Sequence, residues 1–291
     1  MRLITNGAQI ATYSEGKGPP VIFLHGGPGD THHYMKRMAK PLFSQFQCIF
    51  FDQRGTGGSP VVLRDARQFR LELLLEDLFA VRRSFSSEPA ILVGHSWGAI
   101  YALYACMHSP ELFAKAALLN MGPLDEEMGR LTNQALQSSL SASEQVEWSL
   151  LREQREKALI QLDVQNVQKV DRDLMRLRVK SWIFDSALHE TFLEDYYTDP
   201  PPDREVNKWI WQSVNGRFTW DKLHKVPTQM WLCVGQNDSV PVMQAERAAN
   251  ILPNATLTVL PRCGHIPWFE HRDVFYAKLV SFLQGNCDPS D

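Results

Sequence analysis

Gly94-His95-Ser96-Trp97-Gly98 follows the apolar run of residues 90–93 and precedes a helical pattern over residues 99–107. Between a strand and a helix, Gly-x-Ser-x-Gly forms a turn so tight that the serine takes a strained backbone conformation and its hydroxyl is exposed at the sheet edge. The two glycines keep side chains away from this turn. The pentapeptide alone is also compatible with a chance match, but its position between a strand and a helix indicates that Ser96 is a nucleophile.

A serine nucleophile needs a histidine to take its proton and a carboxylate to orient that histidine. Residues 229–235 are apolar and predict a buried strand, and Asp238 lies in the loop that follows. A helical pattern over residues 242–252 and a strand pattern over residues 255–260 come next, and then His265. We therefore expect Ser96, Asp238 and His265 to form a catalytic triad.

Each of these two partners has a plainer structural reading. Asp238 is also suited to capping the helix that follows, and His265 is also compatible with an ordinary loop histidine. The order Ser, Asp, His, with each residue placed after a strand, is much less frequent by accident than either residue alone. The order favours the triad.

A glycine-rich loop, His25-Gly26-Gly27-Pro28-Gly29, follows the apolar residues 21–24. The tetrahedral intermediate of acyl transfer carries an oxyanion that needs backbone N–H donors, and glycines let the main chain approach the substrate. We assign the oxyanion hole to the amides of Gly27 and Trp97. A phosphate-binding loop is disfavoured, because the chain has neither Gly-Lys-Ser/Thr nor G-x-G-x-x-G spacing here.

These residues carry a family resemblance. The chain resembles an α/β-hydrolase, and three of its motifs together resemble the proline iminopeptidase group of serine peptidases: His25 to Gly29, Asp52-Gln53-Arg54-Gly55-Thr56-Gly57-Gly58-Ser59, and Gly94 to Gly98. The resemblance spans nearly the whole chain and is weakest between about residues 125 and 195. It implies an α/β-hydrolase fold with a mostly parallel eight-stranded sheet, helices on both faces and an inserted helical lid.

The periodicity of the sequence gives the same organisation. Strand and helix patterns alternate up to about residue 124, and an Asn6-Gly7 turn predicts a type I′ hairpin near the start. Charged helical patterns, as in residues 143–159 and 170–184, then replace the alternation until it resumes near residue 222. We expect residues 1–124 and 222–291 to form the core, and residues 125–221 to form a lid inserted between the sixth and seventh strands.

The lid region is rich in aromatic residues. Since aromatic side chains at helical spacing usually pack against one another, we expect most of them in the core of the lid and a few in the roof of a pocket over Ser96. The aromatic residues are Trp148, Trp182, Phe184, Phe192, Tyr196, Tyr197, Trp209 and Trp211.

The resemblance implies an aminopeptidase that releases a small N-terminal residue such as proline. In that family acidic lid residues bind the α-amine of the substrate; Glu190, Glu194 and Glu205 are the candidates here by composition. The more typical Gly-Gly-Ser-Trp-Gly of the family carries His95 in this chain, a form found among esterases and carbon–carbon bond hydrolases. The alternative is therefore a carboxylesterase, lactonase or related small-molecule hydrolase, and a minor alternative is a slow-turnover ligand receptor.

Composition limits the possible partners. The chain has 291 residues, 44% of them hydrophobic, and a formal net charge of -3, so it shows no basic footprint for nucleic acid or membranes. We expect a small-molecule or short-peptide substrate, with no cofactor and no metal, since His32-His33 lacks metal-ligand spacing.

No signal peptide or membrane span is expected. An odd number of cysteines without C-x-x-C indicates reduced thiols and a cytoplasmic protein: Cys48, Cys106, Cys233, Cys263 and Cys287.

Overall fold

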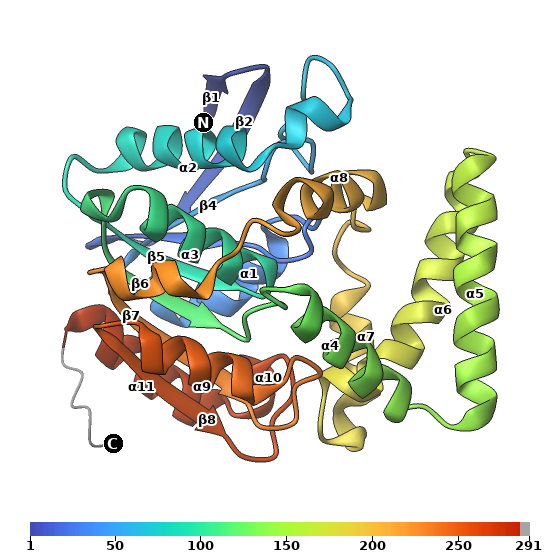
Figure 1. The fold of residues 1–291 in the computed structure, drawn as a ribbon. Helices are drawn as coiled ribbons and strands as arrows, with labels where there is room; N and C mark the ends of the chain where they lie inside the picture. Colours follow the sequence, from blue (N-terminus) through green and yellow to red (C-terminus); the bar gives the residue numbers. More distant parts are fainter. Residues whose placement is uncertain (286–291) are drawn as a thin grey trace.

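The computed structural model describes residues 1–285 and contains one eight-stranded sheet with helices on both faces (Figure 1). The strand order is β1-β2-β4-β3-β5-β6-β7-β8; the pairs β1/β2 and β2/β4 are antiparallel and all other pairs are parallel. The strands are β1 (Arg2–Thr5), β2 (Ala8–Glu15), β3 (Pro20–Leu24), β4 (Gln47–Phe51), β5 (Ala90–His95), β6 (Phe113–Leu119), β7 (Gln229–Gly235) and β8 (Ala255–Leu260). The predicted fold class is confirmed.

The central strands are apolar on both faces because helices cover both faces of the sheet. In β3, Ile22 and Leu24 belong to the hydrophobic cluster that contains α2, α3 and α9, whereas Val21 and Phe23 belong to the cluster that contains α1 and α11. The helices of these two layers are α1 (His33–Ala39), α2 (Leu71–Phe85), α3 (Trp97–His108), α9 (Val242–Ile251) and α11 (Arg272–Gln284), with the short α10 (Pro267–Glu270) before the last.

The first hairpin forms at Asn6-Gly7 as predicted, with Thr5 paired to Ala8. The predicted type I′ turn is wrong, however. A type I′ turn needs positive φ at both central residues, and Gly7 has φ 75° while Asn6 is not among the described non-glycine residues with positive φ. The side chain of Asn6 instead bonds to Glu76 on α2.

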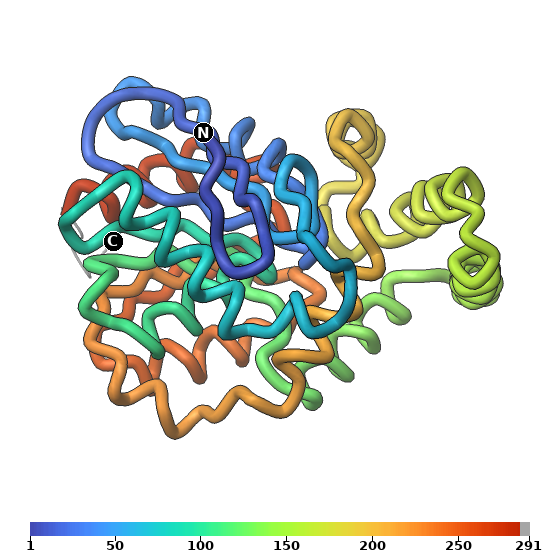
Figure 2. Tube along the Cα trace, turned by 90° about the horizontal axis from the view of Figure 1, so that it is seen from above, coloured from blue at the N-terminus to red at the C-terminus, as the bar shows by residue number. Residues whose placement is uncertain are grey.

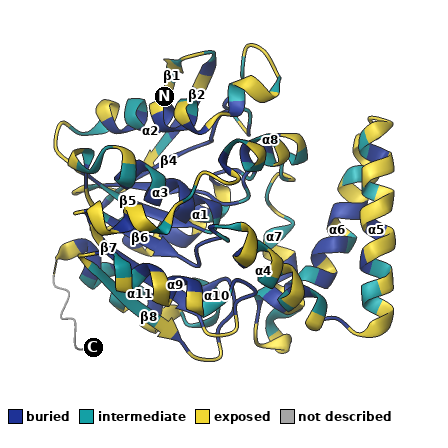
Figure 3. Ribbon diagram, in the orientation of Figure 1, coloured by how far each residue is buried: buried dark blue, intermediate teal, exposed yellow. Residues whose placement is uncertain are grey.

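Between β6 and β7 the chain forms five helices, which we call the inserted helices: α4 (Glu126–Ser138), α5 (Ala142–Ile160), α6 (Val164–Trp182), α7 (His189–Tyr196) and α8 (Arg204–Val214). The long hairpin of α5 and α6 projects from the side of the core (Figures 1 and 2). Its inner face is held by a small cluster that includes Trp148, Leu151, Leu174 and Leu177, and the outer face of α5 is largely exposed (Figure 3).

The last of the inserted helices differs from the others. Val206, Ile210 and Val214 of α8 belong to the main core cluster, together with residues of α2 and α3. The α5/α6 hairpin is therefore anchored between α4, which follows β6, and α8, which packs on the core (Figure 1). No helix in the described part of the chain is long and apolar enough to cross a bilayer.

Four of the five cysteines are buried and unpaired: Cys48, Cys106, Cys233 and Cys263. Burial raises the pKa of the Cys48 and Cys106 thiols to about 12, so both stay protonated at neutral pH. The fifth, Cys287, lies outside the described residues.

A buried ion pair fixes the loop after β4. The Arg54 guanidinium donates to Asp77 of α2 at 2.6 and 2.7 Å and to the carbonyl oxygens of Gln68 and Leu73, and both side chains of the pair are at most 1% exposed. Because these donors are used inside the protein, Arg54 has a structural role.

We expect Arg54→Met to destabilise the fold by about 3–5 kcal/mol, because it leaves the Asp77 carboxylate buried without its partner. Urea unfolding followed by tryptophan fluorescence measures the change. Arg67→Met, which removes an exposed ion pair with Asp65, is the matched control and should leave the midpoint unchanged. A similar midpoint for both variants would contradict the structural role of Arg54.

Candidate active site

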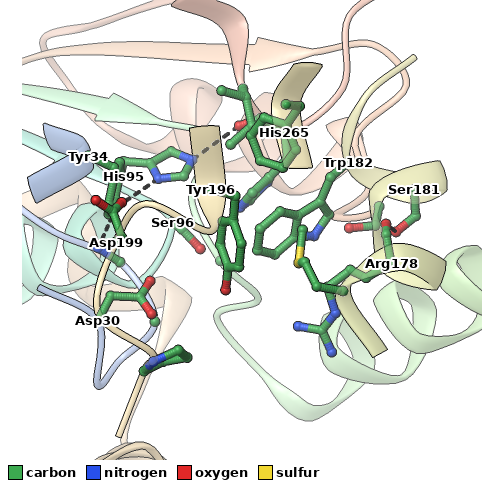
Figure 4. Close-up of a pocket in the computed structure, with 18 of the residues that line it drawn as sticks. Asp30, Tyr34, His95, Ser96, Arg178, Ser181, Trp182, Tyr196, Asp199 and His265 are labelled. Atoms are coloured by element: carbon green, nitrogen blue, oxygen red, sulfur yellow. Dashed lines mark hydrogen bonds between the residues drawn. The ribbon is translucent and has the colours of Figure 1, made fainter. Parts of the chain in front are cut away.

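Ser96 lies at the turn between β5 and α3 and has φ 55° and ψ -118°, an unfavourable conformation for a residue with a side chain. The flanking glycines make this turn possible. A Cβ atom at Gly94 would overlap the carbonyl of Gly98, and one at Gly98 would overlap the carbonyl of Leu24 on β3. The turn therefore packs directly on the neighbouring strand, and the Ser96 side chain points into a cavity (Figure 4).

His265 and Asp238 meet at the same edge of the sheet. The Nδ1 of His265 lies 2.8 and 3.0 Å from the two carboxylate oxygens of Asp238, and His265 lines the cavity together with Ser96. When Nδ1 donates to the carboxylate, Nε2 is left as the proton acceptor of the neutral ring. The structure thus brings together the three residues that the sequence placed in the triad.

Asn120, which sequence analysis did not single out, orients Asp238. Its Nδ2 donates to Asp238 Oδ2 at 2.7 Å and to the Gly264 carbonyl at 3.0 Å. The amide of Val240 donates to the other carboxylate oxygen at 3.1 Å. Asn120 directly follows β6 and has φ 40°, and its position after a buried strand is the signal that would have pointed to it.

His95 connects the loop of His265 to the glycine-rich loop. Its Nε2 lies 3.1 Å from the His265 carbonyl and must donate to it, so Nδ1 accepts from the Tyr34 hydroxyl at 3.1 Å (Figure 4). Tyr34 in turn accepts from the Gly26 amide at 2.5 Å. Burial, together with the neighbouring His265, holds the pKa of His95 well below its usual range, which keeps the ring neutral as this chain of bonds requires.

The proposed oxyanion donors lie on both sides of Ser96. Trp97 is the first residue of α3, so its amide has no acceptor within the helix and points outward from a positive helix end. On the other side, a Cβ atom at Gly26 would lie 3.2 Å from the Ser96 Cβ, which shows how closely the loop of Gly27 approaches. The Trp97 side chain is held by Gln53, which also donates to the carbonyl of His25 at 2.8 Å.

The cavity has a volume of about 800 Å³ and lies between the sheet edge and the inserted helices. The ring of Trp182, at the end of α6, lies 5.0 Å from the His265 ring at a tilt of 34°, and the Trp182 carbonyl accepts from the His265 amide at 2.6 Å. More aromatic residues of the lid region line the cavity than we expected from the sequence: Trp182, Phe192, Tyr196, Tyr197 and Trp211. The core adds Tyr34, Trp268, Phe269 and Tyr276.

The structure does not bring the three glutamates proposed for substrate binding to this cavity. Glu190, Glu194 and Glu205 are exposed, none is among the cavity-lining residues, and Glu205 pairs with Arg64 on the surface. Composition alone could not tell a solvent-facing glutamate from one that faces Ser96. The carboxylates that line the cavity are Asp30, Asp171, Asp195 and Asp199.

Three of those four carboxylates already have a basic partner. Asp195 and Asp199 bind Arg37, and Asp171 binds Arg204 at 2.9 Å. The Asp30 carboxylate forms no hydrogen bond or ion pair with any other described residue, although Arg204 and Arg178 attract it. It directly follows the glycine-rich loop, and this position was its only signal in the sequence.

Comparison with known proteins identifies the family of the chain. Residues 19–272 match the α/β hydrolase fold family. A proline iminopeptidase of Clostridioides difficile is 24% identical over 300 residues, which cover 95% of this chain and 93% of that protein. The crystal structure of a proline iminopeptidase from Mycobacterium smegmatis matches with a TM-score of 0.70 at 18% identity, covering 98% of this chain and 97% of the other.

The structure of Est816, described as an N-acyl homoserine lactone degrading enzyme, matches with a TM-score of 0.68 at 18% identity, over 97% of this chain and all of the other. At such low identities the solved structures show a shared fold. The family match covers most of the chain and includes the turn of Ser96, Asp238 and His265. This chain belongs to the α/β hydrolase fold family.

Proposed function

We propose that the protein is a serine hydrolase that works through an acyl-enzyme. Ser96 Oγ attacks a carbonyl carbon while His265 Nε2 takes its proton, and Asp238 stabilises the imidazolium. The amides of Gly27 and Trp97 hold the oxyanion. His265 then passes the proton to the leaving group, and water, deprotonated by the same residue, releases the acyl group from Ser96.

Within this class we propose an aminopeptidase that releases a small N-terminal residue, as in the proline iminopeptidases. The observation that carries this proposal is Asp30, a carboxylate in the cavity without a partner among the described residues. An α-ammonium that enters such a cavity loses water at a cost of several kcal/mol unless a carboxylate receives it. Asp30 can supply that carboxylate.

The position of Asp30 suits this role. A Cβ atom at Gly27 would lie 3.2 Å from the Asp30 Cγ, so the carboxylate adjoins one proposed oxyanion donor. In an amino-acyl substrate the α-nitrogen is two bonds from the carbonyl carbon, so an acyl oxygen near Gly27 would bring the ammonium near Asp30. Figure 4 shows Asp30 and Ser96 on the same side of the cavity. The lid acid predicted from the family is thus replaced, in this proposal, by an acid of the core.

The second candidate is a carboxylesterase or lactonase. It is favoured by the aromatic walls of the cavity and by the similarity in fold to a lactone-degrading enzyme. Such a substrate carries no ammonium and would gain nothing from Asp30. Substrates that differ only in a free or acetylated amine therefore distinguish the two candidates.

The nucleophile is tested by labelling with a fluorophosphonate probe. We expect labelling of Ser96 in the wild-type protein, and Ser96→Ala should abolish it and lower p-nitrophenyl acetate turnover by several orders of magnitude without loss of fold. Mass spectrometry of the labelled peptide identifies the residue. Labelling of another serine would overturn the assignment, and labelling without turnover would indicate the receptor alternative.

The role of Asp30 is tested with alanine or proline β-naphthylamide and the N-acetylated forms. The wild-type enzyme should prefer the free amine, and Asp30→Asn should lower the ratio of the two kcat/KM values roughly 10- to 100-fold, the effect of losing one charged hydrogen bond. Glu194→Gln, an exposed carboxylate of α7, is the control and should keep the ratio. Equal cleavage of both forms by the wild type would reject the aminopeptidase in favour of the esterase.

The same ratio should depend on pH. Burial raises the pKa of Asp30 to about 6, so the carboxylate is charged above this pH and becomes neutral below it, while the substrate α-ammonium is lost above about pH 8. The preference for the free amine should therefore be greatest between about pH 6 and 8. Both substrates use Ser96 and His265, so the ratio cancels the ionisation of those two residues. A ratio that stays constant from about pH 5 to 7 would count against Asp30.

A further inference from the structure

Arg178 is a cation of the cavity that the proposed chemistry leaves unused. It lies on α6, one turn before Trp182, and lines the cavity. Its guanidinium carbon lies 5.6 Å from the Trp182 ring and 5.4 Å from the Trp148 ring. Unlike the cavity-lining Arg37, Arg155 and Arg204, it forms no ion pair with a carboxylate among the described residues.

Two other arginines lie close to Arg178. Arg155 and Arg204 share the carboxylate of Asp171, at 3.5 and 2.9 Å, and Arg155 also lies 3.7 Å from Glu156 on the surface. Arg178 adds a third positive charge beside them and is attracted by Asp171 and Asp30, without an ion pair to either. Burial, and then the neighbouring Arg204, lowers the pKa of Arg178 to about 10, so it stays charged at neutral pH. An anion bound here would relieve this repulsion and gain a charged, bidentate hydrogen bond.

The position of Arg178 relative to His265 indicates which part of the substrate Arg178 would contact. Trp182 lies between them, with its ring 5.0 Å from the His265 ring and 5.6 Å from the Arg178 guanidinium. Since His265 protonates the leaving nitrogen in the proposed mechanism, the leaving residue lies on this side of Ser96. Figure 4 shows Arg178 across the cavity from Asp30, with Tyr196 between them in this view.

We propose that Arg178 binds the C-terminal carboxylate of the leaving residue, so that the preferred substrates are dipeptides. This inference rests on the proposed aminopeptidase function and names its substrate class. In a dipeptide the carboxylate lies about one residue, roughly 3.6 Å, beyond the scissile bond. Asp30 then binds the α-ammonium of the dipeptide and Arg178 binds its carboxylate. Each charged end is paired as it leaves water, which offsets the cost of desolvation.

The reaction balances as an ordinary hydrolysis. The Ser96 Oγ–C bond forms as the C–N bond breaks, and the serine proton passes through His265 to the leaving nitrogen. The C-terminal amino acid departs with its carboxylate from Arg178. Water then breaks the Oγ–C bond, the N-terminal amino acid leaves, and the proton returns to Ser96.

The test compares Ala-Ala with Ala-Ala amide, which share the amine and the scissile bond and differ in the terminal charge. The wild-type enzyme should cleave the dipeptide with a kcat/KM roughly 10- to 100-fold higher. Arg178→Met, which keeps much of the apolar stem, should bring the ratio close to one. Arg172→Met removes an exposed arginine of the same helix and the same cavity and should keep the ratio.

Equal cleavage of the two peptides by the wild type, or a preference that persists in Arg178→Met, would overturn the inference. If Arg178→Met does not fold, as judged by its thermal midpoint, Arg178→Lys takes its place; it keeps the charge but loses the bidentate geometry, and should retain part of the preference. The comparison of the two peptides with the wild-type enzyme tests the inference even if neither variant folds.

Failure of the aminopeptidase proposal gives a different result, in which neither peptide is cleaved. Carboxylate recognition is then tested with O-acetylglycolate and O-acetylglycolamide, esters that place the charge or its neutral substitute at the same distance from the scissile bond. A preference for the anionic ester that depends on Arg178 would support the carboxylate site, and no preference would reject it.

Discussion

The site depends on one close approach of two backbones. The carbonyl of Leu24 at the end of β3 leaves no room for a side chain at position 98, and the carbonyl of Gly98 leaves none at position 94. With glycine at both places, the turn after β5 packs on β3, and Ser96 is held at positive φ. Because β3 and β5 are parallel neighbours, the same approach brings the glycine-rich loop of Gly27 next to the serine, where its amides can meet developing charge.

His265 is bonded to the inserted helices as well as to the loops at the edge of the sheet. Its amide donates to the carbonyl of Trp182 at the end of α6, and Glu270 accepts from the amides of both Gly264 and Phe184 at 2.7 Å. A shift of α6 would therefore move the loop of His265. In the proposed mechanism, α6 carries substrate-binding side chains and His265 is the general base. Because α6 and the loop of His265 are bonded to each other, the substrate and the base stay aligned.

The charged side chains that line the cavity are of two kinds: some pair with one another and hold the fold, and others have no partner in the described part of the chain and can bind a ligand. Most charged side chains of the lining are neutralised by one another, as Arg37 is by Asp199 and Arg204 by Asp171. Asp30 and Arg178 form no ion pair among the described residues, although Arg178 attracts Asp30. Arg172 and Arg272 also line the cavity without an ion pair among these residues, but both are exposed to solvent. Opposite charges left apart in a partly desolvated space are costly, and a zwitterionic substrate would neutralise both.

The sequence by itself determined the fold class, the turn of Ser96, and the places of Asp238 and His265, because these depend on local patterns: apolar strands, glycines at fixed spacing, and residues just past strand ends. It did not determine that Asn120 holds Asp238, that His95 joins two loops, or that the free carboxylate of the cavity is Asp30 and not Glu190, Glu194 or Glu205. Those depend on which side chains the tertiary structure turns inward and pairs. A charged residue on an amphipathic helix reads the same in sequence whether it faces solvent, a salt-bridge partner or the substrate, and only the packing of α4 to α8 against the sheet edge decides among these.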